Sequence, residues 1–433
     1  MSKPGNSKQI GLAMATALVV GSMVGSGIFS IPSSLAPYGG IGLMGWLVAA
    51  FWAMLMAKMF SHMCKYIPGT GGPYAYSRAA FGDLVGFFVA WGYWLSIWTT
   101  NAAITITFVS YLSVFIPELA SNTLLSTLTA LLTLWLLTAI NSHSIKGGGR
   151  MQLVSTLLKV VPILVVTIGG FYFFNPAHFQ PFNTSTETNF YALTVTSTLC
   201  LFAFLGLEAA TIPAGNISNP KKTIPRATML GTILVVAIYM LSSLSLFGIL
   251  PPDQVANSVA PYSDAAAVMW GNGGQYLVAA GACISAFGAL NGWILIQGQM
   301  PLALAQDKLL PKAFAQTNKN GSPWFSIIAS SVIVSLLLLA NQSQGLNNLY
   351  DIMLKLTAVT VLLSYIFSSA GYGYFAIRQK HGLSPGWKPL TLATVGLLAS
   401  VWLFVGSEWE AIKWGSFGIL AGLPIYLWKK YAP

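Results

Sequence analysis

Long apolar stretches make up most of this chain, and short polar segments separate them. A helix needs about 20 mostly apolar residues to span a bilayer, and twelve stretches approach or exceed that length. Turn signals such as Pro68-Gly69 and Pro251-Pro252 fall between them. The pattern predicts an all-α polytopic membrane protein with twelve transmembrane helices, near residues 9–33, 41–65, 83–115, 123–141, 149–174, 190–213, 227–249, 274–305, 324–341, 350–377, 389–406 and 412–429.

The composition agrees with a lipid environment. Hydrophobic residues are 55% of the chain and charged residues only 7%, whereas soluble domains carry about 25% charged residues. This composition excludes an ordinary water-facing surface. We therefore interpret residues 1–433 as a single transmembrane domain, in a plasma or inner membrane, with the lipid bilayer as its main surroundings.

Of the 21 basic residues, 18 lie in or beside every second loop, counted from the N-terminus. Cytoplasmic loops of membrane proteins carry an excess of Lys and Arg, so this distribution predicts a multi-pass protein with both termini in the cytoplasm. Most of the acids fall in the other loops, and Lys413 departs from the pattern. The net charge of +11 is therefore an orientation signal, and we expect no nucleic-acid partner.

Two of the predicted helices are interrupted at corresponding places. The first contains three glycines between Gly21 and Gly27, and the sixth contains the segment from Ala203 to Ala210 with an acid inside it. Transporters often unwind helices at mid-membrane in matching positions of two inverted halves. We expect five-helix repeats of opposite orientation over about 9–174 and 190–377. A small-residue packing face is the alternative for Gly21 and Gly25.

The glycine segment has a specific chemistry. Unwinding would expose amides at the start of the outer half-helix and carbonyls at the end of the inner one. Such amides favour a carboxylate, and the carbonyls accept an ammonium group, so one broken helix supplies both halves of an α-amino-acid site. The candidate substrate-binding residues here are Ser22, Met23, Gly25, Ser26, Gly27 and Ile28.

Three ionisable side chains fall inside predicted spans, where their cost makes a functional role the default hypothesis. Glu208 lies beside the break in helix 6 and is a candidate for proton coupling or gating, with a structural acid as the alternative. Lys159 in helix 5 could brace the freed carbonyls of helix 1, occupy a sodium-like position or titrate, unless it snorkels to the interface. Lys355 could face the pocket or pair with Asp351 one turn away.

Enzymatic chemistry finds little support in the sequence. The four histidines lie at helix ends or in loops without metal-ligand spacing, and no phosphate-binding G-x-x-x-x-G-K-[ST] segment is present. We expect no enzymatic activity, no cofactor and no metal. Several aromatic residues could instead gate the pathway or stack on a substrate: Tyr93, Trp94, Phe202, Phe204 and Trp293.

Six segments together resemble the amino acid–polyamine–organocation superfamily, and within it the basic amino acid/polyamine antiporters of the arginine/agmatine type. They are VGSMVGSGIFSIP (20–32), GTGGPYAYSRAAFG (69–82), WGYW (91–94), FAFLGLEAA (202–210), NPKKTIPRA (219–227) and GALNGW (288–293). The resemblance covers about residues 9–430. It implies a LeuT-like 5+5 inverted repeat with broken helices 1 and 6. It also implies that helices 11 and 12, over about 389–429, are peripheral and could form the interface of a homodimer.

The resemblance also implies roles for individual residues. Ser26 and Gly27 would bind the substrate carboxylate, and the carbonyls of Met23, Phe202 and Leu205 would bind its amino group. Trp293 would stack on the substrate side chain and Asn101 would line the pocket wall. Tyr93 and Glu208 would contribute to gating and proton sensing.

Three positions depart from the arginine/agmatine type. Ser22 replaces an Asn, Phe202 replaces a substrate-covering Trp, and Lys159 has no counterpart there, although helix 5 lysines recur in proton-coupled symporters of the superfamily. A lysine at 355 that faced the pocket would disfavour arginine. We therefore expect a secondary active exchanger of amino acids, or of an amino acid and an amine, working by alternating access; the alternative is a proton-coupled symporter of neutral amino acids.

Overall fold

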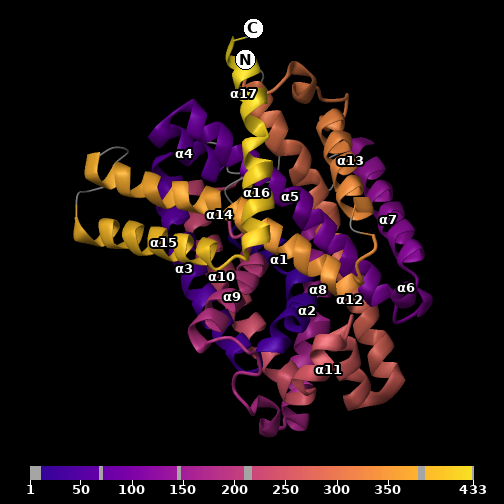
Figure 1. Ribbon diagram of the computed structural model, residues 1–433. Helices are drawn as coiled ribbons and strands as arrows, with labels where there is room; N and C mark the ends of the chain where they lie inside the picture. Colours follow the sequence, from indigo (N-terminus) through magenta and orange to yellow (C-terminus); the bar gives the residue numbers. More distant parts are fainter. Residues whose placement is uncertain are drawn as a thin grey trace.

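The computed structural model describes residues 11–67, 72–143, 148–208, 217–340, 342–378 and 386–431, and every regular element among them is helical. The longer helices enclose one common core (Figure 1). Their bounds are α1 Leu12–Met23, α2 Ser26–Leu35, α3 Ile41–Tyr66, α4 Pro73–Phe81, α5 Asp83–Leu112, α7 Thr123–His143, α8 Gly148–Gly170, α9 Asn189–Leu201, α10 Pro220–Ile249, α12 Pro261–Gln306, α13 Trp324–Ala340, α14 Leu346–Arg378, α15 Trp387–Val405, α16 Trp409–Leu420 and α17 Gly422–Tyr431.

Eight continuous helical stretches among the described residues are long and apolar enough to cross a membrane, and three shorter apolar helices accompany them. The shorter α6 (Glu118–Ser121) and α11 (Pro252–Asn257) lie in connections, as do several 3₁₀ turns. The prediction of a multi-pass, all-helical membrane protein is thereby confirmed. Each of the twelve predicted runs contains helix.

The first predicted span is divided in two, as its glycines indicated. α1 ends at Met23, where Val24 turns extended (φ −72°, ψ 97°), and α2 begins at Ser26 after a non-helical Gly25 (φ −146°, ψ −130°). An extended residue cannot continue the i to i−4 ladder, so the amides that open α2 and the carbonyls that close α1 lack intrahelical partners.

The sixth predicted span is also interrupted. α9 passes into the 3₁₀ turn η4 (Phe202–Phe204), and Gly206 adopts φ +96° two residues later, a conformation that a side chain would strain. The interruption falls within the 203–210 segment where the sequence indicated it, and α9 itself ends at Leu201. Residues 209–216, including Ala209 and Ala210, lie outside the described residues.

Two helices start well before their predicted apolar runs, and one predicted run is divided in two. α10 starts at Pro220, and α12 starts at Pro261 and bends at Gly271 (φ +66°). The last predicted run, 412–429, divides at Ala421 into α16 and α17. Lys3, Lys8, Lys146 and Lys380, which contributed to the orientation argument, lie outside the described residues.

α5 occupies the centre of the bundle. Its membrane-length window is 83% buried, against 28% for α15, which projects to one side with α16 and α17 crossing nearby (Figure 1). The two ends of the bundle are marked by α4 and α11, and we name them the α4 end and the α11 end (Figure 1). The two helix breaks lie beside the central α5, between these ends.

Candidate functional site

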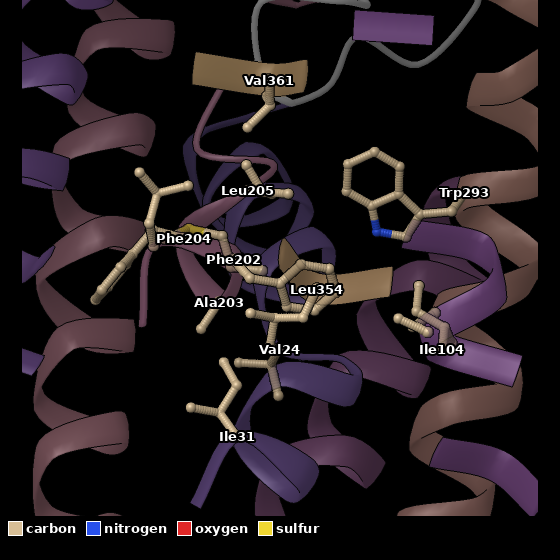
Figure 2. Close-up of a cluster of buried hydrophobic side chains, with 14 of the residues drawn as sticks. Val24, Ile31, Ile104, Phe202, Ala203, Phe204, Leu205, Trp293, Leu354 and Val361 are labelled. Atoms are coloured by element: carbon tan, nitrogen blue, oxygen red, sulfur yellow. The ribbon is translucent and has the colours of Figure 1, made fainter. Parts of the chain in front are cut away.

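The two breaks meet at a small cavity in the core. Its water-accessible space is about 10 Å³, room for about one water molecule. Figure 2 shows Trp293 and Ile104 facing the strip formed by Val24, Phe202, Ala203 and Leu205. The lining residues come from α1, α2 and the break between them, from α5 and α12, and from the segment that follows α9: Ser22, Met23, Gly25, Ser26, Gly27, Thr100, Ile104, Phe202, Ala203, Leu205 and Trp293.

The backbones pack closely around this cavity. A Cβ on Gly27 would lie 3.0 Å from Cα and Cβ of Ala203, and one on Gly206 would lie 3.0 Å from Cβ of Ser22. The Ser22 hydroxyl, 3.0 Å from the carbonyl oxygen of Gly206, links the two broken segments. The residues that the sequence predicted at the two breaks therefore lie side by side and line the same side of the cavity.

Two hydroxyls at the cavity are buried without hydrogen-bond partners among the described residues: Ser26 Oγ and Thr100 Oγ1. Ser26 stands at the first position of the ten-residue α2, where free amides and the positive end of the helix dipole favour an anionic group. An unpaired buried hydroxyl costs free energy. Both groups are therefore positioned to gain a partner from a polar ligand.

Lys159 lies deep in α8 and reaches the first break. Its side chain is fully buried, and Nζ donates to the carbonyl oxygen of Gly21 at 3.2 Å. Of the readings that the sequence left open, this geometry corresponds to bracing: an ammonium group on α8 holds a carbonyl in the last turn of α1.

Tyr239 on α10 was not singled out by the sequence, yet it contacts both breaks. Its hydroxyl lies 2.6 Å from the carbonyl oxygen of Met23, at the end of α1, and 3.2 Å from that of Ala203 in η4. A buried tyrosine needs a partner for its hydroxyl, so a tyrosine in the middle of the 227–249 apolar run was the available signal.

Tyr239→Phe is expected to lower substrate affinity about tenfold. The change removes the hydroxyl that bridges the Met23 and Ala203 carbonyls and fixes the two breaks relative to each other. Restoring that arrangement when a substrate binds then costs free energy, and about 1.4 kcal/mol, the size of one hydrogen bond, is tenfold in an equilibrium. The measurement is substrate affinity of the purified protein by calorimetry. The control is Tyr426→Phe on peripheral α17; equal affinities for the two variants would refute the assignment.

Glu208 lies one residue after Leu207 in the turn that follows η4 and is almost fully buried. The hydroxyl of Tyr93 on α5 donates to Oε1 at 2.5 Å, and the hydroxyl of Tyr365 on α14 lies 3.3 Å from Oε2. Tyr93 is therefore positioned at Glu208, not among the residues that line the cavity. Tyr365 was not predicted; the carboxylate joins α5, α14 and the broken α9 segment.

Asn101 is fully buried in α5 but faces away from the cavity lining. Its Nδ2 donates to Oε1 of Gln297 on α12 at 2.7 Å, and Gln297 Nε2 donates to Ser331 Oγ on α13 at 2.8 Å. Asn101 thus belongs to a polar network behind Trp293 that ties α5, α12 and α13 together. Gln297 was not identified from sequence.

Lys355 lies outside the cavity lining. Its Nζ is 2.6 Å from Oε1 of Glu408, the residue that precedes α16, and both side chains are partly exposed. Asp351 does not pair with it directly among the hydrogen bonds of the described residues but accepts from the Ser34 hydroxyl of α2. Lys355 therefore connects α14 to the peripheral helices in this structure.

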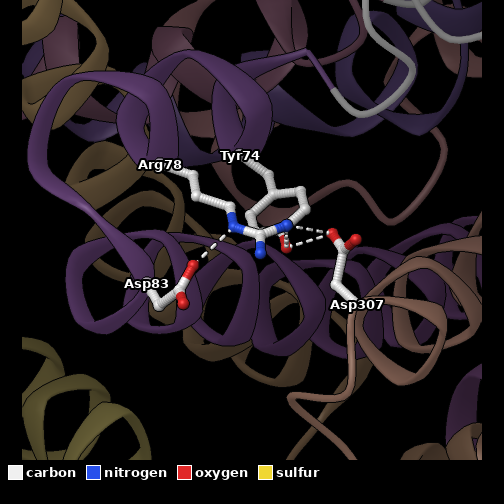
Figure 3. Close-up of polar contacts among 4 residues, drawn as sticks. All are labelled: Tyr74, Arg78, Asp83 and Asp307. Carbon is white, nitrogen blue, oxygen red and sulfur yellow. Dashed lines mark hydrogen bonds and ion pairs between the residues drawn. The ribbon is translucent and has the colours of Figure 1, made fainter.

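A polar cluster on α4 closes the bundle at the α4 end (Figure 3). Arg78 contacts Asp83 Oδ1 at 2.7 Å and Asp307 Oδ2 at 2.6 Å, and the Tyr74 hydroxyl donates to Asp307 Oδ2 at 2.5 Å. Burial and the Asp307 carboxylate raise the pKa of Tyr74, so its hydroxyl remains a donor at neutral pH. The cluster holds α4 against the end of α12.

Asp307→Asn is expected to loosen this end of the bundle. The change removes the charge that joins α12 to Arg78, while Asp83→Asn removes a partner on neighbouring α5 and serves as the matched control. Because the pair is partly exposed, the effect should be modest, about threefold faster labelling of a cysteine introduced at Ser77 of α4, itself buried. Equal labelling rates for Asp307→Asn and Asp83→Asn would show that the ion pair between Arg78 and Asp307 does not hold α4 against the end of α12.

The chain is similar in sequence to several known proteins. The sequence profile described as "Amino acid permease" matches residues 10–411. The cadaverine/lysine antiporter of Escherichia coli (strain K12) is 32% identical over 369 residues, covering 83% of this chain and 82% of that protein. The putative arginine/ornithine antiporter of Bacillus subtilis (strain 168) is 30% identical over 394 residues (84% and 83%), and the arginine/agmatine antiporter of Chlamydia pneumoniae 29% over 448 residues (98% and 91%).

Proposed function

This chain belongs to the amino acid permease family, a family of transporters and not of enzymes, and on that premise we propose that it is a secondary active amino acid exchanger working by alternating access. The observation that carries the proposal is the meeting of two helix breaks at a cavity with unpartnered hydroxyls. The antiporter relatives named above support exchange as the mode of transport.

We propose a twelve-span topology with both termini in the cytoplasm. The eight long spans and three shorter apolar helices account for eleven crossings, and the pair α16–α17 would supply the twelfth. α1–α2 and α9 would then head two inverted five-helix repeats of the LeuT type, which places the α4 end on the cytoplasmic side. The possible homodimer remains an expectation.

The substrate backbone would bind at the two breaks. Its carboxylate would accept from the amides that open α2 and from Ser26 Oγ, and its ammonium group would donate to the carbonyls of Met23, Phe202 and Leu205. Each carbonyl oxygen has two lone pairs, so Met23 can keep its bond from Tyr239 and still accept from a substrate.

The substrate side chain would meet an uncharged wall. Of the described residues that line the cavity, none is charged, and Thr100, Ile104 and Trp293 form the side opposite the breaks. A charge buried without a paired group is costly, so we propose that neutral amino acids bind more tightly than arginine or lysine. Lys355, paired with Glu408, would affect this choice only through the position of α14.

The cavity would enlarge during the transport cycle. Its present space is far smaller than an amino acid, and polar contacts close both ends: Tyr93 and Glu208 toward the α4 end, and Ser34 with Asp351 toward the α11 end. Alternating access would separate one set while the other remains, with the breaks between them as the fixed site.

The test is exchange by purified protein in proteoliposomes. Uptake of labelled neutral and basic amino acids is measured with the lumen empty or loaded with unlabelled amino acid. We expect uptake of a neutral amino acid to rise several-fold with a loaded lumen. Failure of every substrate in the panel, at any lumenal loading, would refute the transport proposal.

Proton-coupled symport of neutral amino acids is the second candidate, and the bond from Lys159 to Gly21 is the observation that favours it. A titratable amine at the first break could link proton release to the position of α1. Accumulation driven by an imposed pH gradient into an empty lumen would favour symport, whereas dependence on lumenal substrate would favour exchange.

A further inference from the structure

A large apolar groove lies outside the substrate cavity, between α3 and α10. Its water-accessible space is about 520 Å³, and none of its lining residues lines the substrate cavity. Figure 1 shows α3 and α10 on the same side of the bundle, and the two helices pack against each other. The groove is lined by Gly40, Leu43, Met44, Trp46, Leu47, Phe174, Pro176, Phe179, Phe182, Met240, Leu241 and Leu244.

The groove opens sideways at its rim and is closed at the α11 end. Met44, Leu47 and Leu241 on its walls are each more than a third exposed. The segment that connects α8 to α9 forms the end wall, because the Ile41 amide donates to the Phe182 carbonyl at 3.1 Å and the Asn175 amide donates to the Gly248 carbonyl at 2.8 Å. Both flanking helices are long and apolar enough to span a membrane, and on that basis we assign the open side to the lipid.

The floor of the groove leads directly to the helix breaks. Trp46 is fully buried and its indole N–H has no acceptor among the described residues. Its ring centroid lies 5.2 Å from that of Tyr239 and 6.0 Å from that of Phe204, and those two rings are 5.6 Å apart. Tyr239 is the residue whose hydroxyl reaches the carbonyls of Met23 and Ala203.

We propose that this groove binds one acyl chain of a membrane phospholipid, and that the bound chain supports the three-ring contact that holds Tyr239 at the two breaks. The lining is apolar and uncharged, so it suits a hydrocarbon tail and offers no contact that would select one headgroup over another. Because Trp46 separates the tail from Tyr239 by a single layer of side chains, the occupant acts on the substrate site through packing.

The experiment fills the groove with protein. Leu241→Trp places an indole in it, and the control Leu234→Trp makes the same change on the same helix at an equally exposed position that does not line the groove. Met44→Trp fills it from α3 and provides a second variant if Leu241→Trp does not fold. The probe is phosphatidylcholine with a diazirine near the end of one acyl chain, in proteoliposomes, with labelled peptides identified by mass spectrometry.

We expect labelling concentrated in residues 40–47 and 240–244, reduced at least fivefold by Leu241→Trp and unchanged by Leu234→Trp. Labelling in proportion to exposure on all lipid-facing helices, or equal labelling of both variants, would overturn the site. A diazirine fatty acid that labels the groove where phosphatidylcholine does not would overturn the assignment to phospholipid.

The link to the breaks has its own measurement, which does not depend on transport. Substrate affinity is determined in nanodiscs made from lipids of short or long acyl chains. We expect the affinity of the unaltered protein and of Leu234→Trp to change at least threefold between the lipids, and that of Leu241→Trp to stay constant. Equal lipid dependence in all three proteins would overturn the coupling.

Discussion

Glu208→Gln is expected to slow exchange about 100-fold while the protein still folds. The carboxylate accepts from Tyr93 on α5 and faces the Tyr365 hydroxyl on α14, and hydrogen bonds to a charged group contribute about 1.5–3 kcal/mol each. The amide keeps the shape of the side chain but turns an N–H₂ group toward one of two hydroxyl donors. The variant therefore loses one of the two hydrogen bonds that join the segment after α9 to α5 and α14.

The variant also removes a titratable group beside the second helix break. We expect the exchange rate of Glu208→Gln to vary less with pH than that of the unaltered protein, measured as initial rates in proteoliposomes. Glu118→Gln, on the exposed α6, is the matched control. An unchanged pH profile with an unchanged rate would remove both roles from Glu208.

A double-mutant cycle tests whether Tyr93 and Glu208 act as one unit in exchange. If Tyr93 acts through Glu208, then Tyr93→Phe should slow exchange in the unaltered protein and add little in Glu208→Gln, because residues in one network are not additive. Fully additive effects would mean that the two side chains act independently.

The position of both helix breaks was predictable because each leaves a local mark in the sequence. Three glycines within seven residues of an apolar run weaken a helix at that place, and an acid within another run needs polar surroundings. Gly25 and Gly206 take the non-helical backbone conformations that these marks indicated. The backbone of the site is therefore largely a local property of the chain.

The side chains that hold the breaks were less predictable because their partners are distant in sequence. Tyr239 is 216 residues from Met23, and Tyr365 is 157 residues from Glu208. A lone tyrosine in an apolar run shows only that its hydroxyl needs some partner. Which carbonyl or carboxylate it meets depends on how α10 and α14 pack against the breaks.

The partner of Lys355 was also unpredictable, although the sequence offered a local candidate. One helical turn separates it from Asp351, which made a local pair reasonable, but Asp351 bonds to Ser34 and Lys355 pairs with Glu408, 53 residues further on. The sequence pattern singled out Lys355 as a cation that needs a partner. It could not show that α14 packs beside the start of α16, where Glu408 becomes the partner of Lys355.

Lys159→Met is expected to reduce exchange roughly 10- to 150-fold without lowering stability. Nζ of Lys159 is buried and donates to the Gly21 carbonyl, and losing a charge-assisted hydrogen bond costs about 1.5–3 kcal/mol. Methionine has a similar length and fills the same space with an apolar side chain. The measurements are initial exchange rate in proteoliposomes and thermal unfolding of the same preparation.

If the ammonium group serves transport, the exchange rate falls while the melting temperature does not. Among the described residues the buried amine has a hydrogen bond only to the neutral Gly21 carbonyl, and replacing a poorly compensated buried charge with a well-packed apolar side chain is often neutral or stabilising. The melting temperature of Lys159→Met should therefore equal or exceed that of the unaltered protein. Val161→Met, on the exposed side of α8, should change neither quantity. A fall in melting temperature together with activity would make Lys159 a structural residue, whereas slower exchange in an equally stable protein would show that the hold of α8 on the end of α1 is part of the transport cycle.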